Sequence, residues 1–285
     1  TVVLNDCQFN RNYSKGTGGC ISGGTISGTF SCGSVFATNC VFTGNASGST
    51  GGAISGAGSG KYYISDSQFI SCSATWNAYF SFEGSPKCDL TVDRCVFRNG
   101  GPSNGSGVSL VNWQSTGTFS LRNSAVIGLK TSTALAKNTK GALQFSDVII
   151  RDSGSASPFP QLTGTGTSFN RVIVESSRTQ TIPAGYFFNS RFAAATDGVR
   201  GNLSADPQFV KPYSSGSAYE GTDYLGGLHV LRDDSPCVDR ERVPVRNGFA
   251  GICLDLSGEF RPMAGKVGGL QLLDVGCYEK LGPNA

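Results

Sequence analysis

Charged residues, histidine and methionine are scarce in this sequence. Asp, Glu, Lys and Arg together make up 15% of the 285 residues, and there is one histidine, His229, and one methionine. The ten cysteines include no C-x-x-C pair. Structural zinc sites need clustered thiolates or imidazoles, so this distribution argues against one, and we expect neither a metal nor a cofactor.

Long apolar runs and helical periodicity are also missing. No uninterrupted apolar segment approaches the roughly 20 residues of a membrane-spanning helix, and the first residues, Thr1–Leu4, do not resemble a signal peptide. Gly, Ser, Thr and Asn interrupt nearly every segment, which argues against a helical fold. We therefore expect an all-β chain without a membrane span, either mature or excised from a precursor.

The net charge of +3 is unevenly distributed. Residues 1–196 contain 14 Lys and Arg against 8 Asp and Glu, whereas the remainder contains 9 against 12. A basic body could favour an anionic glycan, but the charge lacks the density needed to bind a phosphate backbone. Nucleic acid is therefore not an expected partner.

A short unit dominates what the sequence does contain: Asn or Asp, then two residues, then an aromatic or aliphatic residue. It recurs nine times, and two copies have another residue at the first place. The spacing drifts between 17 and 33 residues, which is typical of stacked supersecondary units with variable loops. The closing apolar residues are Phe9, Phe42, Phe69, Phe97, Val126, Ile149, Ile173, Phe192 and Phe209.

Alternating residues precede each unit, so every copy is predicted to form strand, bend, strand. Asn and Asp tolerate the left-handed backbone region, and stacked bends would align their side chains into a polar ladder. Paired glycines before Ile21 and Ile54 introduce a third short strand. Three strands per turn predict a right-handed parallel β-helix. A β-sandwich is the weaker alternative, because its hairpin signals would recur every ~8–12 residues.

We assign residues 1–210 to a parallel β-helix of about nine rungs and residues 211–285 to a C-terminal capping segment of the same domain. A cap is needed because an open solenoid end exposes strand edges and core side chains. Cys7, Cys40 and Cys95 occupy one place in the repeat, where they either stack as small buried groups or, in an exported protein, form disulfides.

The paired motifs Phe42-Thr-Gly-Asn45 and Gly51-Gly-Ala-Ile54, echoed by residues 9–12 and 18–21, resemble the repeats of the polymorphic outer-membrane protein family. The resemblance covers roughly the first hundred residues and implies a surface-exposed β-helix of the kind implicated in adhesion. Typical members precede a membrane barrel, and this chain contains none.

The C-terminal segments 206–209, 223–225, 235–239, 255–262 and 274–279 resemble, in order, the closing region of secreted bacterial right-handed parallel β-helix proteins. Two places that usually hold small residues in that family are Cys237 and Cys277 here. This paired departure from the family pattern suggests a disulfide between them. The acidic residues and Arg261 of this segment are interpreted as turn and ion-pair residues of the cap.

Many β-helices of this kind are polysaccharide lyases or hydrolases. A hydrolase needs two carboxylates roughly 5–10 Å apart, and a metal-assisted lyase needs acidic metal ligands beside a Lys or Arg base. The segments that follow the bends, such as 51–55 and 107–113, contain no carboxylate. We therefore assign no catalytic residue, and an enzyme acting on an acidic glycan is the alternative.

Seven residues are candidates for glycan binding. Five basic residues could line one side of the middle rungs, and two tryptophans could stack on sugar rings. A solvated basic face and aromatic packing under a loop are the competing interpretations. The candidates are Lys130, Lys137, Lys140, Arg151, Arg171, Trp76 and Trp113.

These patterns predict an extracellular or cell-surface β-helix that acts in adhesion, envelope structure or filament assembly. Its expected partners are glycans or the surface of a host or neighbouring cell. Self-association through the N-terminal end is a further expectation, because exposed strand edges recruit other strands.

Overall fold

The structure is a computed structural model in which the described residues form strands, turns and no helix. The description covers residues 1–22, 33–56, 59–83, 87–102, 109–129, 136–138, 140–151, 168–175, 187–188, 208, 232, 234–235, 241–242 and 272–273.

Four strands form a set that repeats along the first part of the chain, and each set makes one coil. The first two coils are β1 (Val2–Asn5), β2 (Gln8–Asn10), β3 (Tyr13–Ser14) and β4 (Ile21–Ser22), then β5 (Val35–Thr38), β6 (Val41–Thr43), β7 (Ala46–Ser47) and β8 (Ile54–Ser55). The next two are β9 (Gly60–Ser65), β10 (Gln68–Ile70), β11 (Ser73–Ala74) and β12 (Asn77–Phe82), then β13 (Cys88–Asp93), β14 (Val96–Arg98), β15 (Gly101–Pro102) and β16 (Ser109–Trp113).

The strands that follow are longer or more widely spaced. They are β17 (Thr118–Ile127), β18 (Ala136–Asn138), β19 (Ala142–Arg151), β20 (Ser168–Glu175), β21 (Phe187–Phe188), β22 (Glu241–Arg242) and β23 (Leu272–Leu273).

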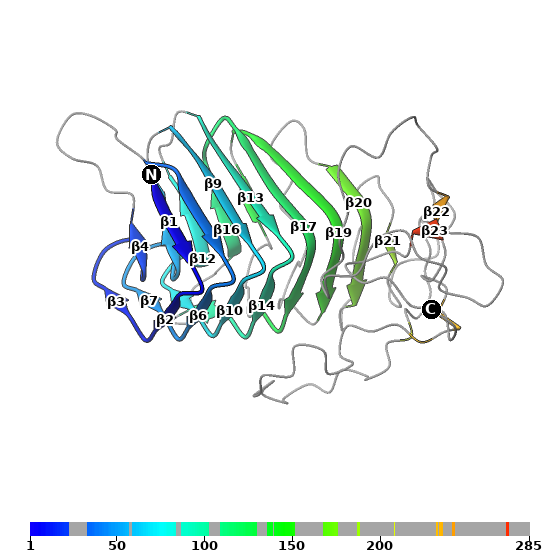
Figure 1. The fold of residues 1–285 in the computed structure, drawn as a ribbon, viewed down its shortest axis with the longest axis horizontal. Coiled ribbons are helices and arrows are strands. Elements are labelled where there is room, and N and C mark those ends of the chain that lie inside the picture. The colour runs from blue at the N-terminus through cyan, green and yellow to red at the C-terminus, as the bar shows by residue number, and fades with distance from the viewer. Residues whose placement is uncertain are drawn as a thin grey trace. The chain divides into compact units, whose positions relative to one another are not determined.

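Equivalent strands of successive coils pair in parallel, so the coils stack as a β-solenoid. Figure 1 shows β2, β6, β10 and β14 side by side in this order. The largest sheet runs β1-β5-β9-β13-β17-β14-β10-β6-β2, because β17 passes through the bend as one strand and joins the runs on its two sides. Strands β15-β11-β7-β3 form a second sheet and β18-β16-β12-β8-β4 a third. The prediction of an all-β parallel β-helix is confirmed.

The chain divides into two compact units. The first comprises Thr1–Leu121, Val126–Gln144 and Ser153–Ser168, and it contains the four coils. The second comprises Arg122–Ala125, Phe145–Asp152 and Phe169–Ala285. Within the second unit β20 and β21 pair in parallel, whereas β22 and β23 pair antiparallel.

A column of phenylalanine rings fills the core of the coils. Phe9, Phe42, Phe69 and Phe97 occupy matching positions on β2, β6, β10 and β14. Their rings stack with centroid distances of 4.8, 4.6 and 4.8 Å. This spacing equals the separation of neighbouring strands, so register alone places ring on ring. The repeat residues predicted to face inward therefore do so in these coils.

Candidate functional site

Polar side chains gather where each coil turns from its first strand into its second. One residue of each turn adopts the left-handed backbone region, with φ between 46° and 56°. We call this row the first corner. Its residues are Asp6, Asn39, Asp66, Arg94, Asn123 and Asp147. Five of the six are Asn or Asp, the residues that tolerate this region best. The bend predicted from the repeat is confirmed in the first five copies, whereas in the sixth it falls on Asp147, one residue after the predicted first place, Ser146.

Side chains of the first corner bond to one another across neighbouring coils. The Asn39 Nδ2 donates to Asp6 Oδ1 over 2.5 Å. Arg94 binds Asp66 through two parallel hydrogen bonds, Nε to Oδ1 at 2.6 Å and Nη2 to Oδ2 at 2.8 Å. The predicted polar ladder is therefore present in these two pairs, and Arg94 supports it although it departs from the Asn or Asp pattern.

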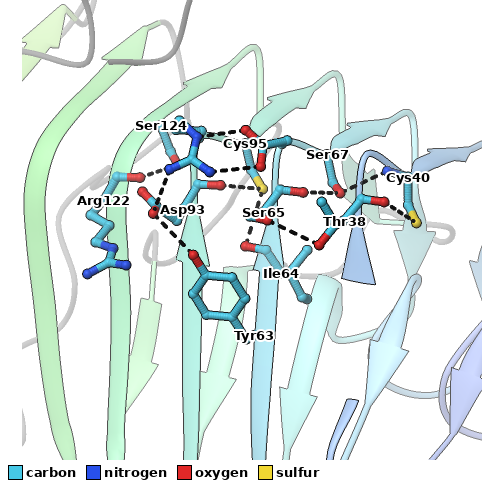
Figure 2. Close-up of polar contacts among 12 residues, drawn as sticks. Thr38, Cys40, Tyr63, Ile64, Ser65, Ser67, Asp93, Cys95, Arg122 and Ser124 are labelled. Atoms are coloured by element: carbon cyan, nitrogen blue, oxygen red, sulfur yellow. Dashed lines mark hydrogen bonds and ion pairs between the residues drawn. The ribbon is translucent and has the colours of Figure 1, made fainter. Parts of the chain in front are cut away.

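A buried carboxylate and a tyrosine extend this cluster. Arg94 Nη1 lies 3.1 Å from Asp93 Oδ2. The Tyr63 hydroxyl donates to the same oxygen over 3.4 Å (Figure 2). The Asp93 side chain is 5% exposed, whereas that of Asp66 is 40% exposed. The hydrogen bonds to Asp66 raise the pKa of Arg94 above its already high ordinary value. A guanidinium held in this way stays protonated, so Arg94 cannot serve as the base of a lyase.

A cysteine or serine follows each first-corner residue from Asp6 to Asn123, and its side chain closes the bend from inside. The thiol or hydroxyl donates to the backbone carbonyl two residues earlier, as Figure 2 shows for Cys40, Ser67, Cys95 and Ser124. The distances are 3.3 Å for Cys40 and Cys95 and 2.6 Å for Ser67 and Ser124. Cys7 donates to Asn5 in the same way over 3.2 Å.

The sequence predicts these cysteines only as small buried apolar groups or disulfide partners. Cys40 and Cys95 are indeed buried and Cys7 is half-buried. Their hydrogen bonds were missed, although serine stands at the same place in other copies of the repeat. In the first five copies of the repeat this place holds only Cys or Ser, and this restriction is the signal that could have revealed a hydrogen-bond donor.

All six cysteines of the described residues are reduced thiols outside any disulfide: Cys7, Cys20, Cys40, Cys72, Cys88 and Cys95. Burial raises the pKa of Cys20 and of Cys72 to about 12, and it also raises the pKa of Cys95. These thiols stay protonated near neutral pH and are poor nucleophiles. The predicted Cys237–Cys277 disulfide lies outside the described residues.

A second corner lies between the second and third strands of each coil. Its residues also have positive φ, between 52° and 62°, but share no side-chain chemistry. They are Arg11, Gly44, Ser71, Asn99 and Gly128. No sequence pattern predicts this corner, because its requirement falls on the backbone alone.

The asparagine that ends each F-x-x-N motif lies just after the second corner. Asn45 Oδ1 accepts hydrogen bonds from the Asn12 backbone N–H and from Asn12 Nδ2, both over 3.0 Å. Asn45 Nδ2 donates to the Phe9 carbonyl over 2.9 Å. The motif therefore combines a ring for the core column with an amide that links the first coil to the second.

The two candidate tryptophans have opposite environments. Trp76 follows β11 and is 57% exposed. Trp113 is fully buried on β16, where its Nε1 donates to the Gly117 carbonyl over 3.1 Å. The hypothesis that Trp113 stacks on sugar rings is therefore wrong, because Phe82 and Phe119 pack against its indole.

The five candidate basic residues are only partly within the described structure. Lys140 is exposed beside β19. Lys137 lies on β18, opposite Asn112 of β16, and Arg151 and Arg171 lie on β19 and β20. Lys130 lies outside the described residues, as do the side chains of Lys137, Arg151 and Arg171. Their assembly into one basic face stays a prediction.

The described residues bring no three His, Cys, Asp or Glu side chains together in an arrangement that could hold a metal ion. They also contain no helix with the length and hydrophobicity of a membrane span. Comparison of this chain with protein-family models, curated proteins and solved structures finds no match.

Proposed function

We propose that this protein is an extracellular or cell-surface module that works without catalysis, by presenting the outer surface of a rigid β-solenoid. Its role would be adhesion, envelope structure or filament assembly. Glycans or the surface of a neighbouring or host cell are the proposed partners.

The observation that carries this proposal is that the charged side chains around the first corner bind one another. Asp66, Asp93 and Arg94 pair with one another at the first corner, and the interior is filled by stacked rings. A hydrolase needs two carboxylates facing a common substrate space, but Asp66 of the first corner and the neighbouring Asp93 both face the Arg94 guanidinium instead. The large exposed residues Tyr13, Phe36 and Trp76 lie on outer surfaces and are available for contacts.

The proposed location is supported by the resemblance of the repeats and of the closing segment to secreted and surface-exposed β-helices. The free thiols are compatible with an oxidising compartment. Oxidation requires the thiolate, and burial keeps Cys72 and Cys95 protonated.

Assembly through the first coil is a second proposed contact. Within the described residues, β1 and β2 end the path of the largest sheet, so their outer edges have no strand partner. Val2 is 45% exposed and Val3 is 63% exposed at this end. An unpaired edge with apolar side chains favours strand addition by a second copy.

One assay separates the proposed role from enzyme action. The full chain is incubated with a panel of acidic polysaccharides while unsaturated and reducing ends are measured, and binding is followed in parallel. We expect binding without product, whereas turnover would establish a lyase or hydrolase instead. Light scattering over a range of protein concentrations tests assembly, and Val3→Lys is expected to reduce any association because it places a charge at the edge.

A further inference from the structure

The outer face of the small sheet β3-β7-β11-β15 has features that neither the corners nor the core explain. Register places Tyr13, Ala46, Ser73 and Gly101 in one row across four coils. The residues after them point inward, as the burial of Ser47 and Ala74 shows. The row therefore faces outward, and after Tyr13 it consists of small residues.

Two aromatic residues of this face lie beside Gly48. A Cβ at Gly48 would lie 2.6 Å from the Lys15 carbonyl oxygen, so this position requires glycine, and the Tyr13 hydroxyl lies 3.3 Å from the same point. Thr75 Oγ1 donates to the Gly48 carbonyl over 2.8 Å, and the Trp76 N–H donates to the Ser49 carbonyl over 3.1 Å. Tyr13 and Trp76 thus flank the Gly48–Ser49 segment.

Both aromatic side chains are open to solvent. Tyr13 is 67% exposed and Trp76 is 57% exposed. They belong to the first and third coils, so they are separated along the stack by two strand spacings, about 10 Å. That separation suits a polymer with several rings better than a single small ligand.

The charge of this face has one sign. Arg11 and Lys15 are exposed on either side of Tyr13, and the Arg11 Cγ lies 3.4 Å from a Cβ placed on Gly44. The described residues of the face (11–17, 44–50, 71–76 and 99–102) include no Asp or Glu. No ion pair among the described residues involves either cation. Among the described residues, the face therefore offers two positive charges without an ion-pair partner beside two aromatic rings.

We propose that this face binds an acidic polysaccharide. The C–H faces of its sugar rings pack on Tyr13 and Trp76, and its carboxylate or sulfate groups pair with Arg11 and Lys15. The floor of small residues and hydroxyls lets the polymer lie flat and accept or donate hydrogen bonds. This inference rests on the proposed surface role and adds a ligand class and a site to it.

The composition of the face favours this ligand over two others. A neutral glycan would leave Arg11 and Lys15 without counter-charges. A nucleic acid requires a denser array of cations than two side chains provide.

The test measures binding of the full chain by titration calorimetry to polygalacturonate, dextran sulfate and neutral dextran. The variants are Tyr13→Ala, Trp76→Ala and the double variant Arg11→Gln with Lys15→Gln. Lys61→Gln is the matched control, because Lys61 is also exposed but lies on β9 of another sheet. Circular dichroism and the unfolding midpoint of each variant confirm that it folds.

We expect binding to one or both acidic polymers and not to dextran. Each aromatic variant should weaken it about tenfold, and the double charge variant should weaken it and flatten its salt dependence. Preference for polygalacturonate or for dextran sulfate identifies the anionic group. Lys61→Gln should bind as the unmodified chain does.

Three results overturn the inference. Acidic-polymer binding that the Tyr13 and Trp76 variants leave intact would place the site elsewhere, while the proposed surface role would survive. Equal binding to dextran would remove the charge argument. Absence of binding to every polymer would reject a glycan ligand, whereas release of cleaved ends in the same samples would reject the surface role itself.

Discussion

The two corners of each coil solve the same backbone problem in different ways. Both turn the chain through the left-handed region, but the first corner stacks Asn, Asp and Arg, and the second uses Arg, Gly, Ser and Asn without a pattern. At the first corner the side chains bond across coils, as Arg94 does to Asp66. At the second corner the bonding falls to the next residue, as with Asn45.

The comparison separates a requirement on the backbone from a requirement on the side chain, which usually occur together in a sequence pattern. A positive φ restricts the residue type at a position only weakly, because several types can adopt it at moderate cost. A side-chain ladder restricts the residue type strongly, because each member needs a hydrogen-bond partner in the coil above or below. Side-chain identity should therefore matter at the first corner and matter little at the second.

The largest expected effect is loss of the ion pair at the first corner. Asp66→Gly removes the cost of a positive φ in a non-glycine residue, but it also removes the two hydrogen bonds to Arg94. After allowance for the solvent exposure of Asp66, we expect the free energy of unfolding to fall by about 2 kcal/mol. Ser71→Gly at the second corner should change the free energy of unfolding by less than about 1 kcal/mol. Glycine adopts the positive φ without cost, and this gain offsets the larger conformational entropy that glycine loses on folding. Urea unfolding measures both, and equal losses would contradict the distinction.

The serine behind the first corner should come next. Ser67 is fully buried, donates to the Ser65 carbonyl and accepts from the Cys40 N–H over 3.0 Å. Ser67→Ala leaves that N–H unpaired and should cost about 1.5 kcal/mol. Ser67→Cys should cost less than half as much, because cysteine fills this place in neighbouring coils. Alanine and cysteine variants of equal stability would show that the hydrogen bond contributes nothing.

A pH-dependent effect is expected behind the second corner. Burial raises the pKa of Cys72 from 9.0 to about 12. Below pH 9 the thiol is neutral in both states, and its contribution to stability is complete. Between these values only the unfolded thiol ionises, so stability should fall by up to about 1.4 kcal/mol per pH unit.

Unfolding of the unmodified chain and of Cys72→Ser at about pH 8 and about pH 10.5 measures this contribution. The serine variant should lose less stability between the two conditions, since its hydroxyl does not titrate there. The same loss in both proteins would mean that other groups cause the alkaline sensitivity.

The smallest effect is expected for Gly44→Asn. Its φ is 62°, and the nearest atom to a Cβ there is Arg11 Cγ at 3.4 Å, on a flexible side chain. Gly44→Asn should therefore change stability by less than about 0.5 kcal/mol, whereas Gly44→Val should cost about 1–2 kcal/mol. Thermal unfolding distinguishes them, and an asparagine variant as unstable as the valine variant would show that the second corner also restricts its side chain.

Prediction from the sequence succeeded where one residue type recurs for a physical reason. The phenylalanines at 9, 42, 69 and 97 and the first-corner residues Asp6, Asn39 and Asp66 belong to this group. It failed where the physical reason lies in the backbone conformation or in residues that become neighbours only in the fold. Ser71 gives no sign of a left-handed bend, and nothing in the sequence around Trp113 indicates that Phe82 and Phe119 cover it.

The candidate site divides in the same way. Trp76 was selected from sequence as a glycan contact, but Tyr13 was not, because 62 intervening residues hide a relation that exists only across coils. Gly48 was not selected either, since its role depends on the Lys15 carbonyl of the coil beneath it.

The sequence alone determined the repeating coil, its inward column of rings and its first corner, because each follows from local alternation and from the conformational tolerance of Asn and Asp. The tertiary structure decided which side chains meet. Parallel register stacked Cys40 near Ser67, paired Arg94 with Asp66 and set Tyr13 and Trp76 on one outer face. Contacts between coils depend on loop lengths and strand register, and these become fixed only when the coils pack together.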